Sequence, residues 1–159
     1  MNRPDNKHDS YMEIATTLAR DCPSNPFAAV LVQSSTGEII ASGVNAANQN
    51  PLSHGEIVCL NAAAQARCSF EWKNTVLYTT AEPCCMCMAA ILWCRIPEVV
   101  FGTSIETLRR LGWDQFTLNS LDVADAATFA DCRITQGVSE SQCDALFESA
   151  ADARHGNSR

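Results

Sequence analysis

The chain has 159 residues, a length that predicts one compact domain over residues 1–159 rather than two. Apolar residues make up 47 % and charged residues only 18 %, which allows a sizeable core and argues against long disordered stretches. The net charge of -7 makes a large nucleic acid an unlikely partner, because phosphate neutralisation by lysine and arginine dominates such binding.

The predicted elements begin with a hairpin and continue as alternating helices and strands. A helix over residues 9–20 precedes two strands over 27–32 and 38–44, which a turn at 34–37 joins. After a polar loop over 45–53 come a helix over 54–68, a strand over 75–79, a helix over 84–93, a strand over 98–103 and a helix over 104–111. This order predicts an α/β fold, with a mixed sheet and helices on both faces.

The C-terminal part of the chain, from about residue 120, is acidic and helical. We expect one or two helices there, around the short segment 132–135. The final residues 153–159 (ARHGNSR) are expected to fray. His8 and His155 lie near the two ends and belong to no motif.

The nine cysteines are an odd number, and their spacing is not that of a disulfide framework. The polar beginning of the chain lacks the apolar stretch of a secretory signal, and no apolar run is long enough to cross a bilayer. We therefore expect a reducing cytoplasm, no membrane partner, and core or incidental roles for most of the thiols (Cys59, Cys68, Cys94, Cys132 and Cys143).

Two short motifs carry the chemistry, SHGE at residues 53–56 and EPCCMC at residues 82–87. Cys84 and Cys87 are one helical turn apart at a helix start, so their thiolates point the same way and the helix dipole lowers their pKa. With His54 they offer two thiolates and one imidazole, the three protein ligands of a catalytic zinc that keeps its fourth position for water. We predict one Zn2+ per chain, with a bound water that ionises to hydroxide near neutral pH.

Glu56 follows His54 by two residues, which places a carboxylate near the metal without making it a ligand. We predict that Glu56 takes a proton from the water and delivers it to a ring nitrogen and then to the leaving amine. Other interpretations exist: Ser53 and Glu56 have the spacing of a capping box, and a C-x-x-C pair alone fits a redox pair or a structural zinc site. Cys85 is the rival thiol and is expected to point elsewhere on the helix.

The combined pattern H-x-E…P-C-x-x-C resembles the cytidine deaminase superfamily of zinc-dependent nucleobase deaminases. The resemblance covers residues 27–116. It implies a three-layer αβα sandwich around a five-stranded mixed sheet, with zinc at the N-termini of two central helices. It also implies that His54, Cys84 and Cys87 bind zinc, that Glu56 is the proton shuttle, and that the protein is a homodimer.

The flanking segments are similar to those of guanine deaminases. PFAAV at residues 26–30 resembles a strand that these enzymes share with tRNA adenosine deaminases, and it makes Phe27 a candidate substrate contact. Asn45 stands where both families place an Asn that contacts the base, with a turn-forming role as the alternative. AILWCR at residues 90–95 makes Trp93 either a pocket wall or a core residue. LGWDQF at residues 111–116 gives Asp114 the role of the acid that reads the purine, or else that of a solvated acid.

The chain departs from guanine deaminases at four points. Gly55 replaces an Ala and is the residue found in cytosine deaminase relatives, Cys85 replaces a Pro, and Gln115 replaces a second Asp. The C-terminal tail of the family ends in aromatics and closes the neighbouring subunit's site, whereas the last aromatic residue here is Phe147.

Our leading hypothesis is hydrolytic deamination of a small amino-substituted purine such as guanine. Deamination of tRNA adenosine shares the flanking strand and Asn45, but the charge of the chain argues against it. Deamination of cytosine or another small pyrimidine is favoured only by Gly55. The alternative from a different class is a non-catalytic, zinc-stabilised protein, and the intact Glu56 argues against that.

Overall fold

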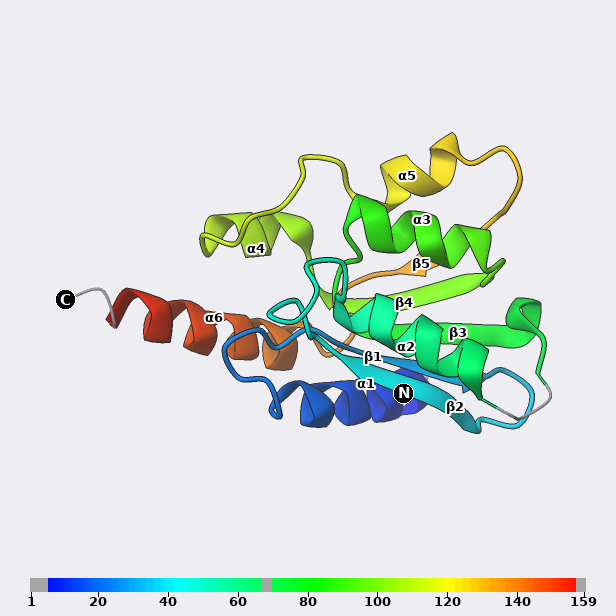
Figure 1. Cartoon of the computed structure of the whole chain (residues 1–159), viewed down its shortest axis with the longest axis horizontal. Helices are drawn as coiled ribbons and strands as arrows, with labels where there is room; N and C mark the ends of the chain where they lie inside the picture. Colours follow the sequence, from blue (N-terminus) through cyan, green and yellow to red (C-terminus); the bar gives the residue numbers. More distant parts are fainter. Residues whose placement is uncertain (1–5, 67–69, 157–159) are drawn as a thin grey trace, which may run out of the picture.

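The computed structural model describes residues 6–66 and 70–156, which form a five-stranded sheet covered by helices (Figure 1). The strands are β1 (Ala28–Gln33), β2 (Ile39–Val44), β3 (Thr75–Ala81), β4 (Glu98–Thr103) and β5 (Arg133–Thr135). Their order across the sheet is β2-β1-β3-β4-β5. β1 runs antiparallel to both β2 and β3, whereas β3, β4 and β5 are parallel, so the predicted mixed sheet is confirmed.

The three central strands are buried along almost their whole length, and the two edge strands are not. β1, β3 and β4 have nearly continuous apolar and β-branched sequences, as expected for strands covered on both faces. Thr79 lies in the middle of the sheet, opposite Ala29 of β1 and Phe101 of β4.

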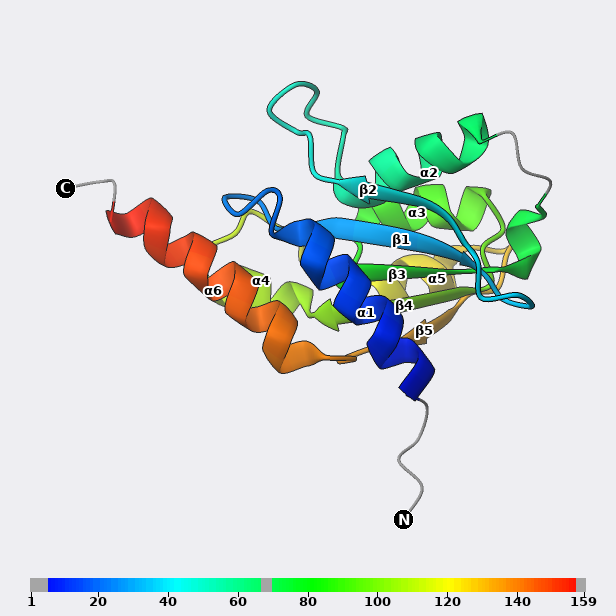
Figure 2. The same cartoon turned by 90° about the horizontal axis from the view of Figure 1, so that it is seen from below.

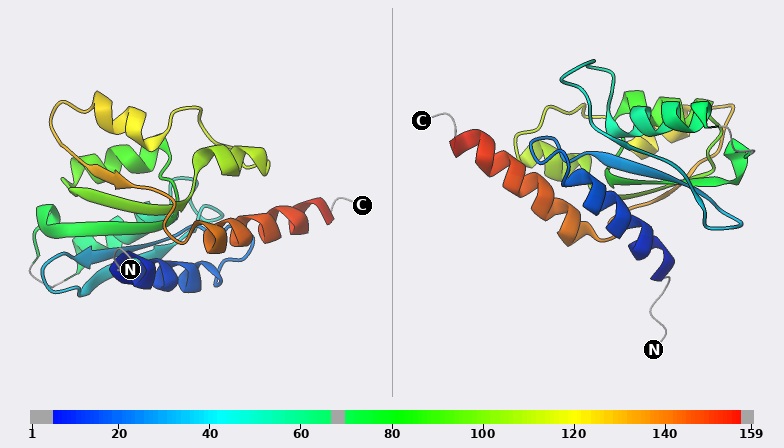
Figure 3. Two further views of the ribbon diagram at one scale, coloured as in Figure 1. Left: turned by 180° about the vertical axis from the view of Figure 1, so that it is seen from behind. Right: turned by 60° about the horizontal axis from the view of Figure 1, so that its bottom comes forward.

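The helices form two layers on the two faces of the sheet (Figures 2 and 3). α1 (Asn6–Ala19) and α6 (Glu140–Gly156) cover one face, and α2 (Gly55–Gln65), α3 (Cys85–Trp93) and α5 (Ser120–Ala126) cover the other. α4 (Ile105–Arg110) follows the end of β4, and a short 3-10 helix, η1 (Trp72–Asn74), precedes β3. The predicted αβα sandwich is therefore confirmed.

The apolar core has one cluster on each face of the sheet and a third at its end. Leu31, Leu77 and Met88 belong to the cluster under α2 and α3, and Met12 and Val30 to the cluster under α1 and α6. The third cluster joins α4 to α6 through residues that include Leu108, Trp113 and Phe147. It lies beside the strand ends from which the motif loops emerge.

The element boundaries differ from the sequence prediction at the two ends of the chain. α1 begins at Asn6 rather than at residue 9, and His8, which we placed in no motif, hydrogen-bonds the hydroxyl of Tyr78 through Nδ1 at 3.0 Å. α6 continues to Gly156, within the range 153–159 over which we expect fraying, and residues 157–159 lie outside the described residues.

The helix expected over 54–68 ends earlier, at Gln65, and Cys68 lies outside the described residues. The acidic segment after residue 120 contains two helices, α5 and α6, around β5, as predicted. None of the helices in the described ranges is both long and apolar enough to span a bilayer.

Candidate metal centre and active site

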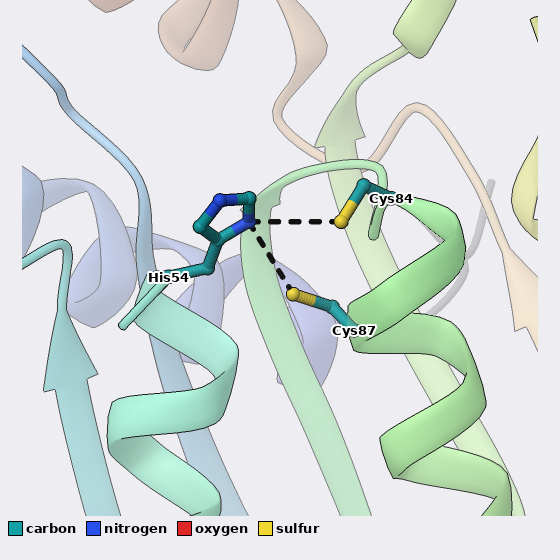
Figure 4. Close-up of side chains that lie close together, drawn as sticks. All are labelled: His54, Cys84 and Cys87. Atoms are coloured by element: carbon teal, nitrogen blue, oxygen red, sulfur yellow. Dashed lines mark hydrogen bonds between the residues drawn. The ribbon is translucent and has the colours of Figure 1, made fainter. Parts of the chain in front are cut away.

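The three predicted zinc ligands meet where α2 and α3 begin, side by side on one face of the sheet (Figure 4). His54 is the N-cap residue of α2, Cys84 is the N-cap residue of α3, and Cys87 lies in the first turn of α3. Both N-cap residues have extended backbone conformations, and neither uses its side chain to cap its helix. The imidazole and the thiol are therefore free to face a shared ion.

The spacing of the ligand atoms fits a tetrahedral zinc ion. Nδ1 of His54 lies 3.6 Å from Sγ of Cys84 and 3.6 Å from Sγ of Cys87, and all three atoms lie within 4.8 Å of one another. Ligands bonded to tetrahedral zinc at the usual Zn–N and Zn–S lengths have their N and S atoms about 3.6 Å apart. Within residues 6–66 and 70–156 this is the one such cluster of His, Cys, Asp or Glu, and Cys85 is not in it, as we predicted.

The two ligand thiols differ in their tendency to ionise. A hydrogen bond from Cys87 lowers the pKa of Cys84 to about 4, although burial opposes the shift, and the nearby imidazole of His54 adds to the lowering. Cys87 is the donor of that hydrogen bond, and both the bond and burial raise the pKa of its thiol. The pKa of His54 is raised, mainly by its hydrogen bond with Cys84. A cation at this point would replace the shared proton and hold both sulfurs as thiolates.

Glu56 is buried, with 3 % of its surface exposed, in the first turn of α2. Thr79 Oγ1 donates a hydrogen bond to Glu56 Oε1 at 3.0 Å, and burial raises the pKa of the Glu56 carboxyl above its usual value. A side chain in this environment suits the acceptance and return of a proton. The capping-box alternative is wrong, because the N-cap residue is His54 and the Glu56 side chain points to Thr79 instead.

Two glycines bring the start of α2 close to the sheet. A Cβ added to Gly55 would lie 2.6 Å from the carbonyl oxygen of Phe27, and a Cβ added to Gly43 would collide with the backbone of Cys59 and Gly55. Gly55, one of the departures from guanine deaminases, thus has a structural cause in this chain. The close approach also places Phe27 directly behind the residue that follows His54.

Phe27, Asn45 and Asp114 lie at the same end of the sheet as the metal ligands. The Asn45 backbone N–H donates to the Phe27 carbonyl at 2.9 Å, and Asn45 Oδ1 accepts from the Ala47 N–H at 3.1 Å, so the turn-forming role of Asn45 is present. The Phe27 ring packs edge-on against Trp113, with ring centroids 5.1 Å apart. Asp114, the next residue, has an exposed side chain.

Trp93 lies elsewhere. It is the last residue of α3, about 9 Å of helix beyond Cys87 and about 13 Å beyond Cys84. Its side chain is 70 % exposed and stacks on Phe129, with centroids 4.5 Å apart. The core interpretation of Trp93 is therefore wrong, and its role as a pocket wall stays a prediction.

The structure adds residues that the sequence motifs did not identify. Thr79 in β3 donates a hydrogen bond to Glu56, and Glu82, a motif residue to which the sequence assigned no role, accepts the backbone N–H of Ile105. In α6, Phe147 packs on Phe27 and Trp113, and the Arg154 guanidinium lies 3.7 Å from the centroid of the Trp113 ring. The C-terminal helix therefore contacts the candidate site of its own chain.

Comparison with known proteins supports the deaminase chemistry. The family model described as the cytidine and deoxycytidylate deaminase zinc-binding region matches residues 5–103, a range that contains the three ligands and Glu56. A tRNA-specific adenosine deaminase of Buchnera aphidicola is 35 % identical over 152 residues, which cover 89 % of this chain and 88 % of the relative. A guanine deaminase of Bacillus subtilis is also 35 % identical, over 106 residues that cover 63 % of this chain and 66 % of the relative.

Solved structures of the same two kinds of enzyme share the fold. The guanine deaminase from Nitrosomonas europaea superposes with a TM-score of 0.79 at 21 % identity, over 96 % of this chain and 86 % of that one. A structure from studies of A-to-I editing by tRNA:A34 deaminases superposes with a TM-score of 0.72 at 26 % identity, over 86 % and 98 %. Similarity alone thus does not separate a free base from a tRNA as the substrate.

Proposed function

Because this chain belongs to the cytidine and deoxycytidylate deaminase zinc-binding family and is a zinc-dependent hydrolytic deaminase, we propose that its substrate is a small amino-substituted purine such as guanine. The observation that carries this proposal is the place of Asp114. Its exposed carboxylate follows Trp113, which packs on Phe27 beside the start of α2. Guanine presents a ring N–H next to an exocyclic amine, and one carboxylate accepts hydrogen bonds from both.

The residues around the metal centre divide the remaining tasks. Phe27 offers an aromatic edge, and Asn45, whose Oδ1 is engaged in its turn, offers Nδ2 as a donor to the ring. When bound by His54, Cys84 and Cys87, zinc supplies the Lewis acidity that makes water a nucleophile at neutral pH.

Hydrolysis replaces the ring amino group with oxygen from water and releases ammonia. One proton must therefore reach a ring nitrogen and another the departing amine. Glu56 carries these protons, and the hydrogen bond from Thr79 holds its Oε1 in place.

Deamination of adenosine in tRNA is the second candidate function. The relative from Buchnera aphidicola that bears this name matches nearly the whole chain. The exposed pair Arg109 and Arg110 on α4 gives the active-site end of the molecule a small positive surface. The net charge of -7 opposes this function, because such a substrate requires many phosphate contacts.

A small pyrimidine is favoured only by Gly55, and the contact of Gly55 with Phe27 supplies another reason for that glycine. A non-catalytic zinc protein is opposed by the buried Glu56 and its Thr79 partner, since a structural site needs no proton carrier.

The decisive experiment measures ammonia release from a panel of guanine, guanosine, cytosine, adenine and adenosine-bearing tRNA by the zinc-loaded protein. We expect guanine to be turned over fastest. Preferred turnover of tRNA or cytosine identifies the corresponding alternative, and no release from any substrate, with stoichiometric zinc, identifies the non-catalytic one.

Asp114→Asn tests the purine-reading role. The amide loses one of the two acceptors, so we expect kcat/KM for guanine to fall by about tenfold to a hundredfold, with a much smaller loss for cytosine. Asp125→Asn, which removes an exposed carboxylate from α5, serves as the control and keeps both activities. Equal losses for guanine and cytosine would show that Asp114 does not read the purine.

Two further expectations concern the context of the enzyme. Exposed apolar side chains occur at the end of α3, in α5 and beside it (Trp93, Phe116, Leu118, Leu121 and Phe129), and a second copy of the chain would cover them in a homodimer. Sedimentation at micromolar concentration checks this; a species of 17.3 kDa alone would contradict it.

A cytoplasmic location suits the two ligand thiols, which must stay reduced to bind zinc.

A further inference from the structure

Glu82 is a buried carboxylate that the deamination chemistry does not use. It stands two residues before Cys84, with 8 % of its surface exposed. Its Oε2 accepts the backbone N–H of Ile105 at 2.9 Å, and its Oε1 accepts both the backbone N–H and the hydroxyl of Ser120 at 2.8 Å. Three short hydrogen bonds to one carboxylate offset the cost of burying it.

The donors come from the two ends of a single segment. Ile105 is the first residue of α4, and Ser120 is the first residue of α5. The Glu82 side chain therefore attaches segment 105–120, at both ends, to the start of the loop that carries Cys84. The backbone N–H of Glu82 also donates to the Thr103 carbonyl at 2.7 Å, which attaches the start of this loop to β4.

The middle of the segment reaches the substrate side of the site. Trp113 packs on Phe27, whose carbonyl oxygen lies against Gly55, and Gly55 follows the ligand His54. Asp114 projects from the same part of the segment. The position of Asp114 relative to the metal loop is thus set by contacts at Phe27 and by the attachment of the segment at Glu82.

We propose that Glu82 is a positioning residue for substrate binding, which holds segment 105–120, and with it Asp114, at a fixed distance from the zinc-binding loop. The proposal rests on the proposed function in that it takes Asp114 as the residue that reads the base. A displacement of about 1 Å in a group that positions the substrate can lower activity by about a hundredfold.

Glu82→Gln tests the attachment with little change in volume. The amide keeps one acceptor oxygen but turns an NH2 group toward a backbone N–H, and the cavity of about 470 Å3 that Glu82 lines beside α4 and α5 has room for the displaced group. We expect zinc content to stay at one per chain, KM for guanine to rise about tenfold, and kcat to change far less. Glu106→Gln removes an exposed carboxylate from α4 and is the matched control, with KM unchanged.

Hydrogen exchange followed by mass spectrometry tests, without any substrate, whether Glu82 holds segment 105–120 in place. In Glu82→Gln we expect faster exchange in peptides from 105–120, with β3 and β4 unchanged. Ser120→Ala, which removes only the hydroxyl bond, should produce a smaller change in the same peptides. Unchanged exchange over 105–120 in Glu82→Gln would overturn the proposal.

A double-mutant cycle with Asp114→Asn completes the test. Since Glu82 acts through Asp114, we expect Glu82→Gln to raise KM for guanine far less in the Asp114→Asn background than in the wild type. Additive effects, or a loss of activity explained by lost zinc at unchanged KM, would overturn the positioning role. If Asp114→Asn alone leaves guanine turnover unchanged, the purine-reading function fails, while exchange and KM for the true substrate still decide whether Glu82 positions the segment.

Discussion

At the scale of single residues, the proposed chemistry depends on one carboxyl group in an enclosed position. Glu56 is buried beside the metal ligands, and the Thr79 hydroxyl occupies one of its oxygens. Burial favours the protonated form, and the hydrogen bond favours the ionised form. The opposing effects suit a group that must take up a proton and release it within one reaction cycle.

Replacement of Glu56 by Ala or Gln tests its proposed role as the proton carrier. We expect ammonia release to fall by about a hundredfold to ten-thousandfold, the usual contribution of general acid–base catalysis, with zinc content unchanged. The measurement is single-substrate kinetics together with metal analysis of the same samples. Activity near that of the wild type in the zinc-loaded Gln variant would contradict the proton-carrier role.

Thr79→Val tests the orientation of Glu56. Valine keeps the shape of the buried side chain but cannot donate to Oε1, so we expect kcat to fall about tenfold. Thr75→Val is a matched control at the other end of β3, where the lost hydrogen bond, from Thr75 Oγ1 to the Trp72 carbonyl, is far from the metal centre. Similar losses of kcat in both variants would indicate a general effect on the sheet.

The sequence allowed prediction of the site residues that have local spacing, and not of those that support them. His54, Cys84 and Cys87 could be found because two short motifs fix their order and helical placement. Thr79 and Glu82 could not, because their partners lie 23 and 38 residues away on other elements, and only the folded sheet brings them together.

At the scale of elements, the start of α2 is pressed against the sheet. Gly55 packs on the Phe27 carbonyl, and Gly43 on β2 leaves room for the backbone of α2. This packing sets how far His54 and Glu56 can reach toward the first turn of α3. The central strands and the helices that carry the motifs were predictable because their burial follows the apolar pattern.

Trp93 shows why a motif alone does not place a side chain. The helix places Trp93 about 9 Å of helix beyond Cys87 and about 13 Å beyond Cys84. The stacking of Trp93 on Phe129 depends on the connection from α5 to β5, which no local pattern reveals.

Gly55→Ala tests the close approach of α2. The added methyl group must displace backbone atoms rather than a flexible side chain, so we expect a loss of about 1–3 kcal/mol in stability and a Tm at least about 2 °C lower. Gly156→Ala at the end of α6 has open space around the new methyl group and should leave Tm unchanged or slightly raised. Equal Tm values for wild type and Gly55→Ala by calorimetry would contradict the tight contact.

At the scale of the whole molecule, charge is the property that separates a free base from a tRNA. The chain carries 11 basic and 18 acidic residues, and two of its ion pairs, Lys73 with Glu71 and Arg133 with Glu98, engage cations away from the metal centre. The parallel strands bring the metal ligands, α4 and the end of α6 to one end of the sheet, where Arg154 lies over Trp113. This end of the molecule therefore carries few cationic side chains, and one of them, Arg154, already lies over an aromatic ring of the protein itself.

This charge distribution makes the salt dependence of turnover a direct test of substrate class. An uncharged base releases no counterions on binding, so we expect kcat/KM for guanine to change by less than about twofold between about 50 and about 200 mM salt. A protein that neutralises several phosphates of a tRNA loses affinity by about a thousandfold or more over the same range. If the preferred substrate shows that steep loss, and Arg109→Glu with Arg110→Glu abolishes its turnover while sparing guanine, the charge argument for a small purine is wrong.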